Sequence, residues 1–501
     1  MGAADMLLLM VTHPIEFRIL VQFWVWHDQR DVTLPEEHKY TGYDRKTMKK
    51  CWAFLDATSR SFSAVIKQLD GDLARVVCLY YLVLRGLDTI EDDMTLSDEK
   101  KQSLLRNFHE HTLTDGWTFA ESGPNESDRQ LLVEYDNVVA ELKLLSPEYL
   151  NVIIESTKKM EVGMADYAHQ AQTTGQVYLE KVEEYDLYCH YVAGLVGEGL
   201  SGLFSASGRE GDFLAGQHEL SNSMGLFLQK TNIIRDYRED VDEHRYFWPR
   251  EIWGDARYGQ PLGRPGFKEM KEMYLPENAR QAQYVQSAMV LNALCHATDS
   301  LDYLRLLKNQ SVFNFCAIPQ TMAIATLTLC YKNPDMFQKN IKIRKAEAAS
   351  LIMRSKNPRD VAYIFREYAR KIHARCTPDD PSFIRIAAAC GSIEKWCEDQ
   401  YPSFIDMSTQ QFNSNDPRSL VAQRDDERMR KASLGKRQQE LLAANSDVVK
   451  AAQQLRTKED QSVMHPGVYI SLAFTVVLLT GLVALYGITW LVDNVNWDFG
   501  K

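Results

Sequence analysis

The chain is poor in the features that define several protein classes. Its nine cysteines are an odd number spread from Cys51 to Cys397 without a C-x-x-C pair, so no zinc site or disulfide framework is recognisable. This usage is typical of reduced cysteines in a cytosolic protein. Acidic residues outnumber basic ones by 68 to 57, and a net charge of −11 argues against a nucleic-acid-binding protein. No G-x-G-x-x-G motif follows a strand-like segment, so a dinucleotide-binding fingerprint is missing.

Runs of residues that alternate at period two, as β-strands do, are missing as well. From about residue 41 to 401 the apolar residues follow a helical period, as Leu150, Ile153 and Ile154 do. Proline is scarce except between Pro249 and Pro276, a stretch that also contains four glycines. That stretch predicts a long connection between helices, and the remainder predicts an all-α domain.

Charge is scarce in two apolar runs near the ends of the chain. Residues 7–11 lack the basic n-region of a signal peptide and predict an ordinary first helix with an apolar face. Gly467 to Val492 is a run of 26 residues without one charge, which at ~1.5 Å per residue spans the ~30 Å hydrocarbon core of a bilayer. The alternative is a buried core helix, but core helices rarely lack charge for so long. With Arg456 and Lys458 upstream, the run predicts a C-terminal anchor and a cytosolic N-terminal part.

These changes in composition divide the chain into five segments. The residues before the apolar run are rich in serine, asparagine, glutamine and charge, which favours a tether over a packed core. The predicted segments are an N-terminal segment (1–40), a helical domain (41–407), a polar tether (408–466), a transmembrane helix (467–492) and, on the far side of the membrane, a lumenal tail (493–501).

A first carboxylate box, DTIEDD, follows an apolar segment that contains a single arginine, Arg85. Each residue of a helix turns by about 100°, so Asp88, Glu91 and Asp92 share one face while Asp93 points elsewhere. Like charges one turn apart repel, and carboxylates among apolar residues are costly unless a cation neutralises them. The box therefore predicts a metal site at the end of a helix.

A second box, DYRED, ends another mostly apolar helix next to Arg235. Asp236, Glu239 and Asp240 share a face, and Asn232 lies one turn earlier on the same side. Hard oxygen ligands suit Mg²⁺, which takes one or two carboxylates together with substrate phosphates. Two ordinary solvated helix faces are the alternative for the pair of boxes.

If the two boxes face each other, metal ions between them would bridge a diphosphate and make it a leaving group. The apolar residues before each box would then line a pocket for a hydrocarbon chain.

Several longer motifs resemble those of the squalene synthase family, and the resemblance runs from about residue 40 to 400. It implies the all-α isoprenoid synthase fold, a single large helical domain with one central cavity. Phytoene and dehydrosqualene synthases share the boxes but are not expected to carry the whole later block or this tail. The motifs are SRSF at 59–62, DTIEDD at 88–93, YCHYVAGLVGEGLS at 188–201, MGLFLQKTNIIRDY at 224–237, DYRED at 236–240, FWP at 247–249 and NQSVFNFCAIPQTMAIAT at 309–326.

The resemblance also implies an activity in sterol biosynthesis. Two farnesyl diphosphates would condense head to head with Mg²⁺ to presqualene diphosphate, which NADPH would reduce to squalene. The protein would be a monomer anchored in the endoplasmic reticulum membrane, with no nucleic-acid partner. Two alternatives stay open: a dehydrosqualene- or phytoene-type synthase that ignores NADPH, and an inactive membrane-tethered helical scaffold.

Individual roles follow by position from the same resemblance. Tyr188 would handle the proton of the first half-reaction, with Tyr185 and Tyr191 as rival candidates. The implied metal ligands are Asp88, Asp92, Asp236 and Asp240, helped by Glu91 and Glu239. The implied diphosphate-binding residues are Arg60, Arg85, Arg235 and Asn232, whose arginines offer forked donors to phosphate oxygens.

The remaining implied residues line a hydrocarbon pocket or bind NADPH. Lys342 and Arg344 match a basic site for NADPH phosphates, although alone they are typical of a solvated charge run. Arg238 departs from the apolar residue found in relatives and is expected to point away from the metal face. The pocket residues are Phe62, Tyr81, Phe313, Phe315, Cys316 and Pro319, for which plain core packing is the alternative.

Overall fold

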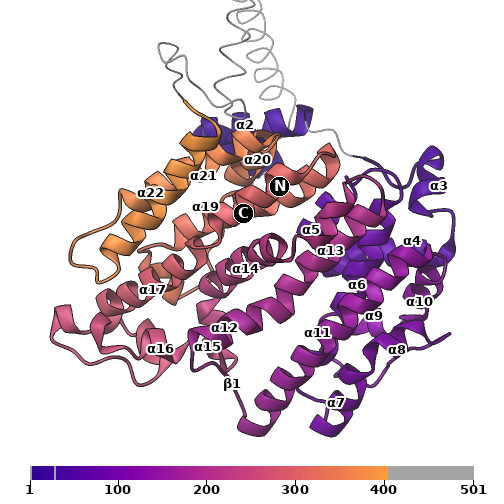
Figure 1. The fold of residues 1–501 in the computed structure, drawn as a ribbon, viewed down its shortest axis with the longest axis horizontal. Helices are drawn as coiled ribbons and strands as arrows, with labels where there is room; N and C mark the ends of the chain where they lie inside the picture. Colours follow the sequence, from indigo (N-terminus) through magenta and orange to yellow (C-terminus); the bar gives the residue numbers. More distant parts are fainter. Residues whose placement is uncertain (1–2, 27–29, 404–501) are drawn as a thin grey trace, which may run out of the picture. The chain divides into compact units, whose positions relative to one another are not determined.

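Helices make up nearly all of the regular structure in the computed structural model, which describes residues 3–26 and 30–403 (Figure 1). The predicted tether, transmembrane helix and lumenal tail lie outside the described residues. The helices of the first half are α1 (Ala3–Thr12), α2 (Pro14–Trp26), α3 (His38–Thr41), α4 (Lys46–Thr58), α5 (Arg60–Ile66), α6 (Leu73–Asp92), α7 (Asp98–Arg106), α8 (Phe108–Leu113), α9 (Arg129–Val133), α10 (Asp136–Leu142), α11 (Pro147–Thr174), α12 (Val182–Cys189), the π-helical turn η2 (His190–Gly194) and α13 (Leu195–Ala206).

The second half continues the helical pattern and confirms the all-α prediction. Its helices are α14 (His218–Arg235), α15 (Tyr237–Asp242), α16 (Arg250–Trp253), α17 (Ala279–Leu294), α18 (Ala297–Leu306), α19 (Gln310–Cys330), α20 (Lys345–Arg354), α21 (Pro358–His373) and α22 (Phe383–Gln400). Between Pro249 and Pro276 the chain forms only α16 and the short 3₁₀ turns Ala256–Tyr258, Gln260–Leu262 and Met270–Tyr274, as the prediction of a long connection requires.

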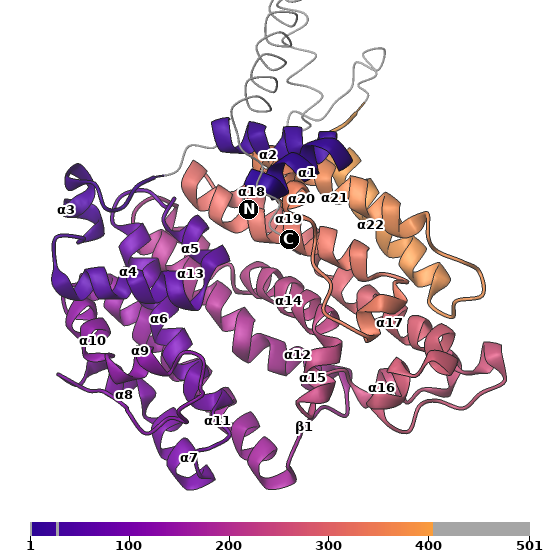
Figure 2. The same cartoon turned by 180° about the vertical axis from the view of Figure 1, so that it is seen from behind.

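The core forms around α14, which contacts α13, α17, α18, α19 and η2. On one side of it α11 packs against α6, α7 and α13, and on the other α19 packs against α21 (Figures 1 and 2). Among the described residues α19 alone is long and apolar enough to cross a membrane, and 78 % of that stretch is buried inside the protein. Burial of this kind is what a central core helix needs.

Glycine permits α14 to approach both η2 and α13 closely. A Cβ atom at Gly225 would lie 2.4 Å from the carbonyl oxygen of Ala193, and one at Gly197 would lie 2.5 Å from that of Ser221. A side chain at either position would therefore push the two segments apart. This contact sets the position of α12, which leads directly into η2.

The described strands are two residues long and were not predicted from the sequence. β1 (Val177–Tyr178) pairs in parallel with β2 (Arg245–Tyr246), with Val177 opposite Arg245. The pair joins the end of α11 to the segment that follows the second carboxylate box. Two residues are too few to show a period, so only the fold reveals the pairing.

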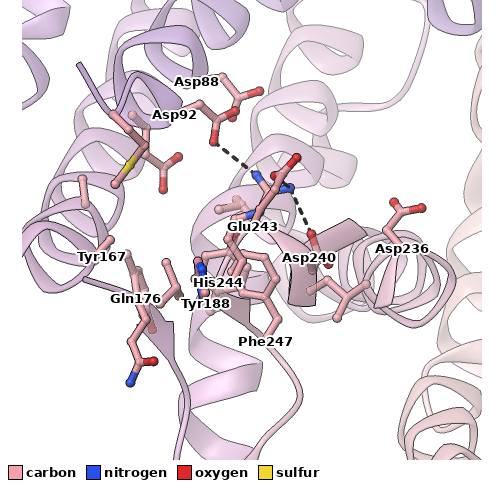
Figure 3. A pocket seen from close by; sticks show the side chains of 18 of the residues that line it. Asp88, Asp92, Tyr167, Gln176, Tyr188, Asp236, Asp240, Glu243, His244 and Phe247 are labelled. Carbon is pink, nitrogen blue, oxygen red and sulfur yellow. Dashed lines mark hydrogen bonds and ion pairs between the residues drawn. The ribbon is translucent and has the colours of Figure 1, made fainter. Parts of the chain in front are cut away.

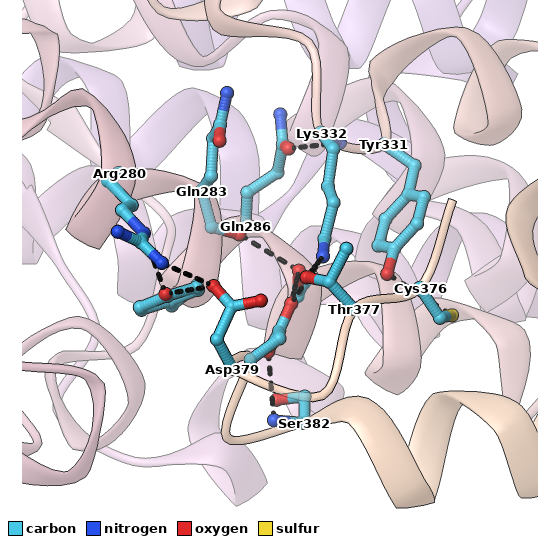
Figure 4. A network of polar contacts seen from close by, with 12 residues as sticks. Arg280, Gln283, Gln286, Tyr331, Lys332, Cys376, Thr377, Asp379 and Ser382 are labelled. Atoms are coloured by element: carbon cyan, nitrogen blue, oxygen red, sulfur yellow. Dashed lines mark hydrogen bonds and ion pairs between the residues drawn. The ribbon is translucent and has the colours of Figure 1, made fainter. Parts of the chain in front are cut away.

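A network of polar contacts joins α17 to the loop between α21 and α22 (Figure 4). Asp379 accepts hydrogen bonds from Arg280 at 2.9 Å and from the hydroxyl of Tyr284 at 2.5 Å. The buried Asp380 accepts one from Ser287 at 2.6 Å, and the ammonium group of Lys332 lies 3.4 Å away. Each buried charge in this network thus has donors or a counter-ion.

The N-terminal helices belong to the same compact unit as the rest, which runs from Met1 to Ser403. α2 packs against α20, and α3 packs against α6. The first helix predicted at residues 7–11 is confirmed as part of α1, which ends before Pro14. All nine cysteines are free.

Candidate active site

A polar cavity of about 810 Å³ lies between α6, α11, α12 and the end of α14 (Figure 3). Both carboxylate boxes line it: Asp88, Glu91 and Asp92 come from α6, and Asp236 and Asp240 come from the junction of α14 and α15. The predicted meeting of the two boxes across one cavity is therefore present in the fold.

The first box ends α6, and its last carboxylate has turned away from the cavity as predicted. Asp93 is fully buried and accepts hydrogen bonds from the backbone N–H groups of Thr95 and Gly123, both at 2.9 Å. Burial opposes ionisation of Asp93, but the donors of Thr95 and Gly123 outweigh it and lower the pKa of this carboxyl. Asp93 is thus a structural carboxylate that ends the helix.

The three carboxylates that face the cavity have raised pKa values. Burial is the largest cause for each. The charge of Asp92 adds to burial at Asp88 and raises its pKa to about 6, although Arg85 lies 2.8 Å from the Asp88 carboxylate. The pKa of Glu91 rises well above its usual range, because Asp92 and Asp88 add to the effect of burial. A cation in the cavity would relieve this repulsion.

The second box divides its carboxylates between the cavity and the exterior. Burial raises the pKa of Asp240 to about 7. Arg235 forms a two-pronged contact with Asp236, at 2.7 and 2.6 Å, and does not line the cavity among the described residues. Glu239 is exposed, lies outside the cavity lining and accepts a hydrogen bond from Asn340 at 3.0 Å. The shared face predicted for Asp236, Glu239 and Asp240 is incomplete because a break between α14 and α15 at Asp236 changes the direction of the chain.

Arg245 lines the cavity and was missed by the sequence analysis. Its guanidinium lies 3.0 Å from Asp240 and 3.7 Å from Asp92, so it joins the two boxes across the cavity. It also lies 2.8 Å from Glu243, and its Nε atom is buried with no hydrogen-bond partner in the described part of the protein. The available signal was its place two residues before the FWP motif, but its position depends on the β1–β2 pairing.

The carboxylates of the two boxes suit Mg²⁺ only when substrate phosphate oxygens complete the coordination of the ion. Among the described residues no three acidic, histidine or cysteine side chains converge closely enough to hold a metal ion by themselves. Mg²⁺ keeps several waters and is usually bound by one or two carboxylates plus substrate phosphates. The separated carboxylates of the two boxes match that requirement.

Tyr188 lines the cavity next to the first box. Its ring stacks on Phe247, with centroids 4.7 Å apart, and meets Tyr167 edge-on at 5.0 Å. Burial first, and then the charges of Glu91 and Asp92, raise the pKa of the Tyr188 phenol well above its usual range. The phenol therefore keeps its proton at neutral pH.

The rival tyrosines lie elsewhere. Tyr185 is fully buried and its hydroxyl has no hydrogen-bond partner in the described part of the chain. The ring of Tyr191 packs against Gly163 of α11, where a Cβ atom would meet it at 2.2 Å. Of the three candidates Tyr188 alone is among the described residues that line the cavity. Short π-helical turns such as the one that follows it are frequent at functional sites.

An apolar cavity of about 320 Å³ adjoins the polar one. The residues common to both walls are Arg85, Asp88, Val192, Gln229 and Asn232. The two cavities therefore meet at the first carboxylate of α6 and at the end of α14. A ligand with a charged head and an apolar chain fits this arrangement.

Most of the predicted pocket residues line the apolar cavity, namely Phe62, Tyr81, Phe315, Cys316 and Pro319. Phe313 is buried but is absent from the described lining, so its predicted role requires correction. It lies two residues, or about 200° of helix rotation, from Phe315 and therefore faces the other side of α19. Cys316 and Pro319 are on the same side as Phe315.

Like Arg235, the predicted basic residues Lys342 and Arg344 are absent from the described cavity linings. Lys342 and Arg344 are exposed, and Arg344 forms an ion pair with Glu16 of α2 at 2.5 Å. Arg60 begins α5, and its side chain lies outside the described part of the molecule. Arg238 points away from the metal face, as expected, and pairs with Asp242 at 2.9 Å.

Comparison with known proteins assigns this arrangement to a class. The profile of the squalene/phytoene synthase family matches residues 55–347. This stretch contains both boxes, Tyr188 and the helix that lines the apolar cavity.

Similarity to curated proteins identifies the branch of this family. A squalene synthase of Ganoderma lucidum is 64 % identical over 407 residues, which cover 81 % of this chain and 87 % of the relative. The squalene synthase of Schizosaccharomyces pombe is 49 % identical over 391 residues, covering 77 % and 81 %. A solved ligand complex of TcSQS is 37 % identical with a TM-score of 0.65, and covers 70 % of this chain and 98 % of its own. The chain belongs to the squalene synthases, which are farnesyl-diphosphate farnesyltransferases of the isoprenoid synthase fold.

Proposed function

We propose that the chain makes squalene from two farnesyl diphosphates with Mg²⁺ and NADPH, while anchored in a membrane by residues 467–492. One observation carries the proposal for the site. A polar cavity lined by both carboxylate boxes opens onto an apolar cavity at Asp88 and Asn232. A diphosphate group fits the first cavity and its hydrocarbon chain fits the second.

Asp88, Asp92, Asp236 and Asp240 would hold Mg²⁺, with Glu91 as a further oxygen ligand. The ion, when bound, neutralises diphosphate charge and makes it a better leaving group. Support comes from the raised pKa values of Asp88 and Asp240, because such carboxylates gain most from a nearby cation. Glu239 lies outside the lining and takes a lesser part.

Two arginines of this chain can meet the diphosphate directly. Arg85 and Arg245 both line the polar cavity, and each already pairs with a box carboxylate. Their planar guanidinium groups bind phosphate oxygens with two donors at once. Arg235 does not line the described cavity and instead donates hydrogen bonds to Asp236.

Tyr188 is suited to relaying a proton in the first half-reaction. The C–O bond of one substrate breaks, and the double bond of the other substrate attacks the resulting cation. Loss of a proton then closes the cyclopropane ring of presqualene diphosphate. Because the Tyr188 phenol is itself protonated, it can accept this proton only while passing its own to an oxygen of the released diphosphate. The aromatic rings of Phe247 and Tyr167 next to Tyr188 limit the access of water that would quench the cation.

The NADPH site rests on the basic run around Lys342 and Arg344. NADPH, when bound, supplies the hydride that converts the rearranged cation of the second half-reaction into squalene. Lys342 is exposed and free to meet a phosphate, whereas Arg344 would first have to release Glu16. The charge-free run at 467–492 supports a single-pass anchor in the endoplasmic reticulum membrane with the catalytic unit, as a monomer, in the cytosol.

Product analysis tests the proposal. The unit that ends at Ser403 is incubated with labelled farnesyl diphosphate and Mg²⁺, with and without NADPH. We expect presqualene diphosphate without NADPH, squalene with it, and neither after chelation of the metal. Dehydrosqualene or phytoene regardless of NADPH would assign the chain to the sister synthases, and no release of diphosphate would favour the inactive scaffold.

A further inference from the structure

The first two helices expose an unusual amount of apolar surface. Of the seventeen large apolar side chains that are exposed in the described part of the chain, six lie between residues 8 and 25. Leu8, Val11 and Ile15 are 65 %, 76 % and 69 % exposed, and Trp24 is 84 % exposed. The other two are Met10 and Val25. A small surface segment with this density of apolar side chains marks an interaction site.

Four of these six side chains lie on one face of a helix, whereas Met10 and Trp24 project from other sides. Leu8, Val11 and Ile15 follow each other at intervals of three and four residues, and Val25 continues the same spacing ten residues later, with the exposed Arg18 and Gln22 at the positions between them. The helical hydrogen bonding continues across the boundary between α1 and α2, since the N–H of His13 bonds to the carbonyl of Leu9 at 2.8 Å. We call the face formed by Leu8, Val11, Ile15 and Val25 the outer face.

The opposite side of α2 is held on the body of the protein. α2 packs against α20, and Glu16 forms its ion pair with Arg344 there. Figures 1 and 2 show both helices along one end of the unit, beside α20. Because the other side of α2 already packs against the protein, the outer face remains exposed on a helix that has its core contacts.

We propose that the outer face of α1 and α2 lies on the surface of a lipid bilayer and sets the orientation of the catalytic unit. A helix with an apolar outer face and an exposed tryptophan near its C-terminal end matches an interfacial membrane helix. The exposed charge on α2 is Arg18, and Lys345 is exposed at the start of α20, where α2 docks. These cations suit anionic lipid headgroups.

The inference rests in part on the proposed anchor. A chain tied to a bilayer by residues 467–492 keeps the outer face close to lipid, so even weak binding by one helix is effective. The outer face nevertheless makes its own prediction, because it lies in a part of the chain that can be tested without the anchor. The unit Met1–Ser403 is compact, and the solved TcSQS chain folds with only 70 % of this chain matched.

The experiment is co-sedimentation of residues 1–403 with phosphatidylcholine vesicles that contain phosphatidylserine. We expect binding that falls about tenfold in the triple variant Leu8→Ser, Val11→Ser, Ile15→Ser. The matched control is Leu113→Ser, Leu144→Ser, Ile384→Ser, which removes three exposed apolar side chains elsewhere and should bind as the parent does. Thermal melting checks that both variants are folded.

Three results would overturn the proposal. They are no binding by the parent unit, equal loss in the control, and a concentration-dependent dimer that the outer-face variant abolishes without any vesicle binding. The proposed transmembrane anchor is tested separately by treating membranes that contain the full-length chain with alkaline carbonate. Extraction of the chain by this treatment would contradict the anchor. Failure of the catalytic proposal is detected by product analysis of the same protein, since the outer-face variant should form squalene at the parent rate from soluble substrate.

Discussion

Asp88 and Asp379 are both aspartates that pair with an arginine, yet their surroundings shift their pKa values in opposite directions. Asp88 sits among other carboxylates in the cavity wall, and its pKa rises to about 6 because of burial and the charge of Asp92. Asp379 accepts hydrogen bonds from Tyr284 and Arg280, which lower the pKa of this carboxyl strongly. The polar network around Asp379 is complete within the described chain, whereas the cavity has more carboxylates than cations.

The difference separates a structural region from a functional one. A network that only holds the fold can satisfy each of its charges internally. A site that binds a cation and a diphosphate cannot pair all of its charges internally, because the bound ligand would then relieve no repulsion among them. The excess of carboxylates at the cavity is therefore a cost in stability that ligand binding relieves.

The largest effect is expected from removal of a cavity carboxylate. Asp88→Asn or Asp240→Asn should lower squalene formation by roughly 10³-fold or more, because each would hold the metal ion. Folding should be retained or improved, since repulsion among the carboxylates decreases. The measurement is turnover together with thermal melting. Asp242→Asn, in the same segment but paired with Arg238 outside the cavity, is the control and should keep near-parent turnover.

A smaller but still large effect is expected at the tyrosines of α12. Tyr188→Phe should slow formation of presqualene diphosphate by about 10²- to 10³-fold, because the phenol relays the proton. Tyr185→Phe removes a buried hydroxyl that has no partner in the described part of the chain and does not line the cavity, so it should leave the rate within a few-fold. Single-turnover measurement of the intermediate distinguishes the two. Equal rates for both variants would assign the proton to another group.

Arg245→Gln tests the cation that joins the boxes. We expect a loss of about 10²-fold in kcat/KM, since one arginine contact to a developing negative charge is removed. The same change should lower the Mg²⁺ concentration needed for half-maximal turnover, because Asp92 and Asp240 lose a competing cation and gain more from binding the ion. Arg257→Gln, which breaks an exposed pair with Asp255, is the matched control. An unchanged metal requirement would mean that Arg245 serves only the fold.

The raised pKa values predict a pH dependence of stability. Asp88 titrates near 6 and Asp240 near 7 in the fold, whereas an unfolded aspartate titrates near about 3.9. Their contribution to the free energy of unfolding is therefore fully present below about pH 4 and is lost as the pH rises through 6 to 7. The double variant Asp88→Asn, Asp240→Asn should melt like the parent near about pH 4 and above it near about pH 8. Mg²⁺ with diphosphate should reduce that difference.

The smallest effect is expected at Asp379, where the sign is reversed. Its pKa is lowered, so its contribution is present above about pH 4 and is lost as the pH falls toward and below that value. Asp379→Asn should destabilise the fold by less than about 1 kcal/mol at neutral pH, because the pair is largely exposed. Turnover should not change. A large loss of activity would contradict the division between the two regions.

Local patterns were enough to predict the helical class and the first box. The face shared by Asp88, Glu91 and Asp92, and the exclusion of Asp93 from it, follow from 100° per residue within one helix. The same rule applied to α19 would have separated Phe313 from Phe315, so that error was avoidable. The second box was less predictable, because the break at Asp236 between two helices is not marked by proline or glycine.

By itself the sequence determined the elements whose cause is local: helices with apolar faces, carboxylates one turn apart, and a charge-free run of 26 residues near the C-terminus. Only the tertiary structure decided which distant groups meet. Arg245 reaches Asp92 through a two-residue strand pair, and Glu16 reaches Arg344 across 328 positions. Such contacts depend on how whole helices pack, where burial of apolar surface outweighs any preference of the individual charged residue.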